Sequence, residues 1–136
     1  QEREDLLRNP TLDNLEERAA RIAVPGSEQY EDLVHFVRGL VERGERAVPG
    51  TPDYSDVTVE NVALPTGPDR TRATVTVCDV SNQAIARSDG SIVPGTDDLI
   101  ALRSEQPVEL TSNGWLPGEP GTPIAGQRGA TSCPDG

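Results

Sequence analysis

The chain lacks lysine and methionine, and among 136 residues it has only one histidine, two cysteines, one tryptophan, two tyrosines and one phenylalanine. All twelve basic residues are therefore arginine, and 23 acidic residues give a formal net charge of -11. Nucleic acids and anionic membranes bind cationic surfaces, so this balance predicts that the domain binds neither directly. With 34% hydrophobic residues, we expect one domain with a thin core of Val, Leu, Ile and Ala.

Long hydrophobic runs are absent as well, since none approaches the about 20 residues of a membrane-spanning helix. The chain opens without a signal peptide, and we expect Gln1 to begin a mature or trimmed form. The sequence contains no G-x-S-x-G, phosphate loop, H-E-x-x-H or C-x-x-C pattern. Asp89, Asp97 and Asp98 lack the spacing of a calcium loop and suit a turn and a polar loop. We predict no metal site and no cofactor.

Helices are predicted in the first third of the chain. Residues 1–9 are highly charged, and we expect a frayed segment there. Asn9 and Pro10 are typical of a helix start, and apolar residues follow at helical spacing at Leu12, Leu15, Ala19 and Ile22. A second helix should begin after Ser27 and end at Gly44. Its apolar face consists of Tyr30, Leu33, Val34, Val37, Leu40 and Val41, and His35 lies on its polar side.

Strands are predicted after Gly50, where the apolar period changes from 3.6 to 2. They cover residues 57–64, 71–80 and 98–111, a short hairpin around Asp89-Gly90, and a last strand that carries Trp115 and Leu116. Pro107 lies inside the long strand, so that point should be an edge or a bulge. Helices followed by an antiparallel meander predict an α+β fold at residues 10–116, with the helices packed on one face of a curved sheet.

The two cysteines, Cys78 and Cys133, are predicted to form a disulfide. They are too few for a structural zinc site, and a cysteine in the middle of a strand lacks the histidine base and the local setting of a nucleophile. Nine of the twenty residues from Pro117 to Gly136 are glycine or proline, so this tail should have no regular structure. A disulfide would tether the tail, and it requires an oxidising compartment. We therefore expect an extracytoplasmic protein.

Several motifs carry a resemblance to known proteins: V-E-R-G-E-R-A-V-P-G after a helix, Cys78-Asp79-Val80-Ser81 on a strand, Gly114-Trp115 after a turn, and the late Cys133. Over Leu12 to Cys133 the chain resembles a group of actinobacterial exported proteins and lipoproteins with an NTF2-like (cystatin-like) fold. The resemblance implies a cone of sheet and helices, in a protein that is secreted or anchored at the cell envelope. The segment before Asn9 is too short for the long first helix of such domains, so we expect either that this helix was cut away or that the cone is open.

Three kinds of function remain open. Isomerase-like and dehydratase-like members of this superfamily use a carboxylate base in an apolar cone, and here Asp79 is the candidate base, with Tyr54 and Trp115 lining the pocket. We expect instead that Asp79 lies at the end of a strand, where it accepts local backbone hydrogen bonds next to Ser81 and Asn82. We favour a non-catalytic binding or accessory module that docks a protein partner or a small apolar ligand on its concave face, because no convincing catalytic set accompanies Asp79. A purely structural domain is the third possibility.

Overall fold

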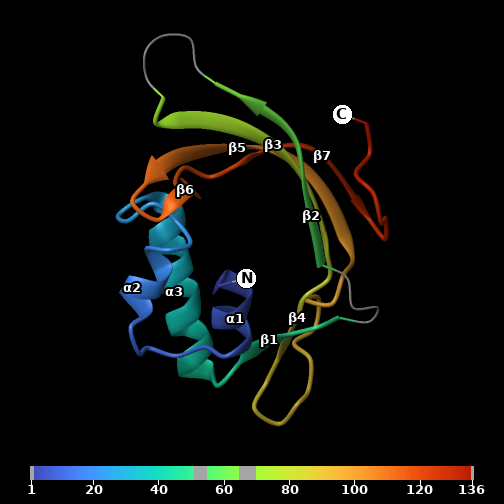
Figure 1. Ribbon diagram of the computed structural model, residues 1–136. Coiled ribbons are helices and arrows are strands. Elements are labelled where there is room, and N and C mark those ends of the chain that lie inside the picture. The colour runs from blue at the N-terminus through green and yellow to red at the C-terminus, as the bar shows by residue number, and fades with distance from the viewer. Residues whose placement is uncertain (1, 51–54, 65–69, 136) are drawn as a thin grey trace.

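A computed structural model describes residues 2–50, 55–64 and 70–135 (Figure 1). The fold is α+β, as the sequence predicts. The elements in chain order are α1 (Glu2–Arg8), α2 (Leu15–Ala19), α3 (Glu28–Arg43), β1 (Arg46–Val48), β2 (Ser55–Ala63), β3 (Arg72–Ser81), β4 (Ala84–Ala86), β5 (Ile100–Thr111), β6 (Gly114–Pro117) and β7 (Thr122–Arg128). Within the described ranges, no helix is long and apolar enough to cross a membrane.

The main sheet is antiparallel and has the strand order β2-β3-β5-β6, with β7 pairing with β5 as well. Strands β1 and β4 form a separate two-stranded sheet. Figure 1 shows the main sheet as a curved wall, with the three helices on its concave side and gathered toward β6. Strand β2 lies at the opposite edge of the sheet from β6. This arrangement leaves the β2 end of the concave side away from the helical bundle.

Helix α3 forms where its sequence predicts it. The Ser27 side chain caps its first turn by accepting a hydrogen bond from the Tyr30 N–H at 3.3 Å. Gly44 ends the helix in the left-handed region, at φ 66°, which glycine adopts without a steric penalty. The side chains of the expected apolar face are buried at Leu33, Val34, Val37 and Leu40.

A hydrophobic core cluster forms among the helices and β1, apart from the buried apolar residues of the main sheet, Ala73, Val80, Ala101 and Leu116. Its buried members are Leu6, Leu7, Leu15, Ala19, Leu33, Val34, Val37, Leu40 and Ala47. Residues 1–9, where the sequence predicts a frayed segment, instead hold helix α1, because Leu6 and Leu7 are buried in this core. Helix α2 begins at Leu15 rather than at Asn9-Pro10, which lie in the link between α1 and α2.

Strand β2 contains a bulge that the sequence pattern hints at. Its apolar side chains follow a step of two at Val57 and Val59 and then a step of three to Val62. The register with β3 shifts between Val59 and Asn61, so an extra residue, Glu60, is accommodated there. The bulge restores Val62 to the face that Val57 and Val59 occupy.

Pro107 lies in the interior of β5, opposite Thr74 of β3. On the other side of β5, pairing with β7 ends at Glu105 and pairing with β6 begins at Val108. Proline has no N–H to donate, and it occupies the break between these two ladders. The sequence predicts an edge or a bulge at this position. In the structure, Pro107 instead lies where β5 has no partner on one side, between the end of its pairing with β7 and the start of its pairing with β6.

The glycine- and proline-rich tail is more ordered than its composition predicts. Residues 117–136 contain β7, which pairs with β5 from Ile100–Arg128 to Glu105–Thr122. The predicted disulfide between Cys78 and Cys133 is present, with Cα atoms 5.9 Å apart. The tail is therefore held by a strand ladder as well as by the disulfide.

Candidate binding cleft

One face of the main sheet looks toward the helices, and we call it the inner face. Successive residues of a strand point to opposite sides, so the register places Val57, Val59 and Val62 of β2 beside Val75, Val77 and Asp79 of β3, and Leu102, Ser104 and Gln106 of β5 beside those. Two observations show that this side of the sheet faces the helices. Gln29 of α3 donates from Nε2 to Gln106 Oε1 at 2.8 Å, and Leu7 of α1 shares a hollow with Val57 and Asp79.

The inner face carries an apolar row that the fold leaves uncovered. Val57, Val59, Val62 and Leu64, which we call the inner stripe, are 61%, 57%, 56% and 56% exposed. Neighbouring Val75 and Val77 are half-buried. None of these residues belongs to the helical core cluster. The stripe extends along the edge of the sheet that lies away from the helices, so it is open to a ligand.

A hollow of about 330 Å³ separates α1 from one end of the inner face. Arg3, Glu4 and Leu7 line it from the helix, and Asp79 and Gln83 are among the residues that line it from the sheet side. The Gln83 amide donates from Nε2 to Glu4 Oε1 at 3.1 Å and so ties α1 to the segment after β3. Most of the lining residues are polar or charged, with Leu7 and Val57 as the apolar exceptions.

Asp79 projects into this hollow from within β3 instead of ending the strand in a turn. It is opposite Val57 on one side and Leu102 on the other. Burial raises the pKa of its carboxyl group, and a hydrogen bond from Ser81 and the charge of Arg3 oppose that rise. Asp79 is therefore a partly desolvated carboxylate whose neighbours favour its charged form. A general base needs this kind of position, but it also needs an apolar site and an oxyanion partner.

A second hollow, of about 460 Å³, adjoins the first because Arg3 lines both. Asp32, Leu33 and Phe36 line it from α3, and Pro120 and Gly121 line it from the segment before β7. Phe36 is 41% exposed, so its ring contributes apolar surface here.

An amide network holds α3 to the sheet beside this second hollow. Gln29 donates from Nε2 both to Gln106 Oε1 at 2.8 Å and to the Glu119 carbonyl at 2.9 Å. Gln106 in turn donates to the same carbonyl at 2.8 Å. The network fixes the distance between the helical side and the sheet side of the cleft.

A third hollow, of about 350 Å³, lies at the other end of the inner stripe. Leu64, Ala73 and Val108 supply apolar surface, and Arg72 and Glu109 form an ion pair at its side with atoms 3.3 Å apart. The three hollows and the inner stripe together make the candidate cleft. Volumes of this size match those of small-molecule sites.

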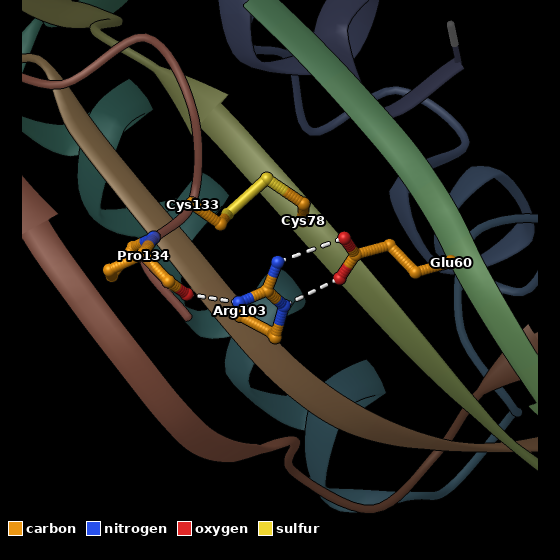
Figure 2. The surroundings of a disulfide bond; sticks show 5 residues. All are labelled: Glu60, Cys78, Arg103, Cys133 and Pro134. Carbon is orange, nitrogen blue, oxygen red and sulfur yellow. Dashed lines mark hydrogen bonds and ion pairs between the residues drawn. A yellow bond between two sulfur atoms is a disulfide. The ribbon is translucent and has the colours of Figure 1, made fainter. Parts of the chain in front are cut away.

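The outer face carries the disulfide and an ion pair (Figure 2). Arg103 of β5 donates from Nε to Glu60 Oε1 at 2.6 Å and from Nη2 to Glu60 Oε2 at 3.0 Å. A further hydrogen bond runs from Arg103 Nη1 to the Pro134 carbonyl, next to Cys133. The hydrogen bonds from Arg103 lower the pKa of Glu60 and keep its carboxylate ionised. Arg103 thus joins the edge strand β2 to the tethered tail.

The predicted pocket residues do not come together. Asp79 lines the first hollow, whereas Trp115 does not. Trp115 lies on β6, opposite Leu110 of β5, and is 45% exposed. Tyr54 lies outside the described residues. No local sequence pattern indicates a site at Arg3, at Phe36 or at the Gln29–Gln106 pair. The sequence shows the spacing of the apolar residues in the inner stripe. That spacing does not reveal whether their side chains are exposed.

No group of three or more His, Cys, Asp or Glu side chains in the described part of the chain is placed to hold a metal ion. The charged groups of the first two hollows are Glu4, Asp32 and Asp79 against Arg3 alone. The cleft therefore has a net negative lining beside its apolar stripe.

Comparison with known proteins gives the fold alone. No family model matches the chain, and no curated protein matches it. Among solved structures, it is similar to the intermembrane space region of the chloroplast protein ARC6, with a TM-score of 0.60 and 12% sequence identity. The match covers 93% of this chain and 88% of that one. The two chains thus share an architecture over most of their lengths.

Proposed function

We propose that this chain is a non-catalytic binding or accessory module with an NTF2-like (cystatin-like) fold. The observation that carries the proposal is the inner stripe, where Val57, Val59, Val62 and Leu64 are each more than half exposed. A contiguous apolar row of this kind is typical of a binding surface. Helices on the concave side of a curved antiparallel sheet support the fold assignment.

The energy available from the stripe is moderate. Fully burying a valine or leucine side chain is worth about 1.5–3 kcal/mol, so completing the burial of one that is already half covered is worth about 1 kcal/mol. Four such side chains supply about 4 kcal/mol, which corresponds to a dissociation constant of about 1 mM before the costs of association. A protein partner or a small apolar ligand reaches a higher affinity by also occupying the adjoining hollows.

We place this module outside the cytoplasm, secreted or anchored at the cell envelope. The disulfide between Cys78 and Cys133 supports this location, because structural disulfides persist in oxidising compartments. The net charge of -11 supports a partner that is neither a nucleic acid nor an anionic membrane.

A neutral, polarity-sensitive dye such as Nile red tests the stripe. The double variant Val59→Ser/Val62→Ser should lose most of the fluorescence enhancement that the native protein produces. Ile92→Ser is the matched control, because Ile92 is 41% exposed on the hairpin after β4, away from the stripe. Equal enhancement in all three proteins would contradict the proposal.

An isomerase-like or dehydratase-like enzyme is the second candidate. One observation favours it: Asp79 is a partly buried carboxylate in a hollow, with a raised pKa. The charged and amide side chains of Arg3, Glu4 and Gln83 in that hollow weigh against it, since such a base requires an apolar wall. Asp79→Asn decides the matter in any substrate screen, because loss of a general base costs about 10²–10⁴-fold in rate. A turnover that survives this substitution would eliminate Asp79 as a base.

A further inference from the structure

The free edge of β2 is a second feature of the side of the molecule that carries the stripe. Within the described residues, β2 pairs with β3 and with no other strand. All nine residues of β2 are exposed. An edge strand of this length presents unpaired backbone N–H and C=O groups, which pair readily with an added strand.

The side chains of β2 define which strand would fit. Toward the inner face they are valines, and toward the outer face they include Asp56, Thr58 and Glu60. The sequence of β2, S-D-V-T-V-E-N-V-A, contains two acids and no base. Cross-strand neighbours stabilise a sheet when apolar residues face apolar ones and opposite charges meet. The complementary strand is therefore apolar on alternate residues and basic on the others.

One acid of this edge, Glu60, is held in place in the free protein. Glu60 is held by two hydrogen bonds from Arg103, and its side chain is still 33% exposed, so it remains accessible to a neighbouring cation. Asp56 is exposed on the same strand, and Glu105 is on the outer face of β5. These three acids outnumber Arg103. An incoming basic side chain would find carboxylates already in place.

A second copy of this chain is a poor occupant of the edge. Pairing β2 with β2 would bring Asp56 and Glu60 of both copies to the same face, between molecules that each carry a net charge of -11. Repulsion between these acids therefore opposes self-pairing of the edge but not pairing with a basic strand.

We propose that the free edge of β2 accepts an extended segment of another polypeptide, alternately apolar and basic, as an added strand. The apolar residues of that segment lie beside the inner stripe, and its basic residues lie beside Asp56 and Glu60. This inference rests on the proposed binding function and names the chemistry of the partner.

The probes are two capped nine-residue peptides. The basic peptide alternates valine with lysine and threonine, and the acidic peptide replaces each lysine by glutamate. Binding is measured by fluorescence anisotropy, and the site by amide hydrogen exchange. We expect the basic peptide to slow exchange at Ser55–Ala63 and to bind at least about tenfold more tightly than the acidic one. The charge-reversed variant Asp56→Lys should reduce that preference, whereas Asp89→Lys, on the turn after β4, should leave it unchanged.

Other outcomes overturn the inference. Equal binding of the two peptides, or protection elsewhere than β2, would contradict an acidic edge site. Protection of β2 that grows with protein concentration and without peptide would show that a second copy is the occupant. If Nile red still reports the inner stripe while neither peptide binds, the edge inference fails and the proposed function stands. If the dye response is also insensitive to Val59→Ser/Val62→Ser, both fail.

Discussion

Removing the disulfide should cost this protein a large part of its stability. The double substitution Cys78→Ser/Cys133→Ser opens a cross-link between residues 55 positions apart. In the chain-entropy model a loop of this length contributes about 4 kcal/mol, mainly by restricting the unfolded chain. Domains of this kind have a total stability of about 5–15 kcal/mol, so the variant should remain folded but with a narrow margin.

The contacts of the folded tail indicate that removing the disulfide lowers stability by freeing the unfolded chain and not by disrupting the fold. Strand β7 is held by its ladder with β5, and the Gly129 N–H donates to the Leu99 carbonyl at 2.7 Å, so the fold should survive without the cross-link. Only the segment after residue 129 loses its tether, together with the hydrogen bond from Arg103 to the Pro134 carbonyl.

Urea denaturation followed by circular dichroism gives the free energy of unfolding, and thermal melts should show a midpoint lower by about 15 °C. The native protein with and without a reductant is the matched control, because it compares the same sequence. Trypsin should also cut the variant faster after Arg128, the last basic residue before the freed tail. A loss below about 1 kcal/mol in both comparisons would refute the loop-entropy reasoning.

Three further predictions concern single residues. Gly50→Ala should destabilise the fold by about 2–3 kcal/mol in urea melts, because its Cβ would lie 1.9 Å from the backbone oxygen of buried Asn82. Gly39→Ala is its control and should be neutral or stabilising, since the Cβ meets only the end of a flexible side chain within α3; an equal loss at both positions would contradict the steric argument. Ser27→Ala should cost about 1 kcal/mol through loss of the α3 cap, and an unchanged urea midpoint would show that the cap contributes nothing. Burial raises the pKa of Asp79, so the folded chain keeps the proton of this carboxyl group to a higher pH than the unfolded chain does. The free energy of unfolding therefore falls as the pH rises from the unfolded pKa of about 3.9 to the raised pKa. Thermal melts should therefore show that Asp79→Asn is more stable than the native protein above this pH range and equally stable below it. A destabilised variant at neutral pH would mean that the interactions of Asp79 with Arg3 and Ser81 outweigh its desolvation.

The sequence by itself determined the elements whose signals are local. Ser27, Gly44 and an apolar face at helical spacing specify α3 without any help from the rest of the chain. The period-two segments predicted the antiparallel strands, and the elimination of zinc and nucleophile chemistry left the disulfide that the structure contains. Each of these predictions depends on backbone preferences or on a pairing with few alternatives.

Tertiary structure decided the elements whose signals are distant. Helix α1 is short and charged, and it is ordered because Leu6 and Leu7 are buried in a core formed by residues of α2, α3 and β1. Strand β7 has a composition typical of a disordered tail, and the available edge of β5 makes it a strand. Both cases depend on partners far along the chain, which a local pattern does not reveal.

The candidate cleft illustrates the same division. The spacing of the valines in β2 predicts an ordinary buried face. Alternation shows which residues share one side of a strand, but it does not show what covers that side. They are exposed because the buried side chains of the helices pack mainly against one another and against β1, and the helices gather toward β6. Asp79 shares their side by alternation, but its hollow is defined by Arg3, Glu4 and Leu7, more than 70 residues earlier. Sequence periodicity assigned the faces, and only the three-dimensional packing decided which of them remained open.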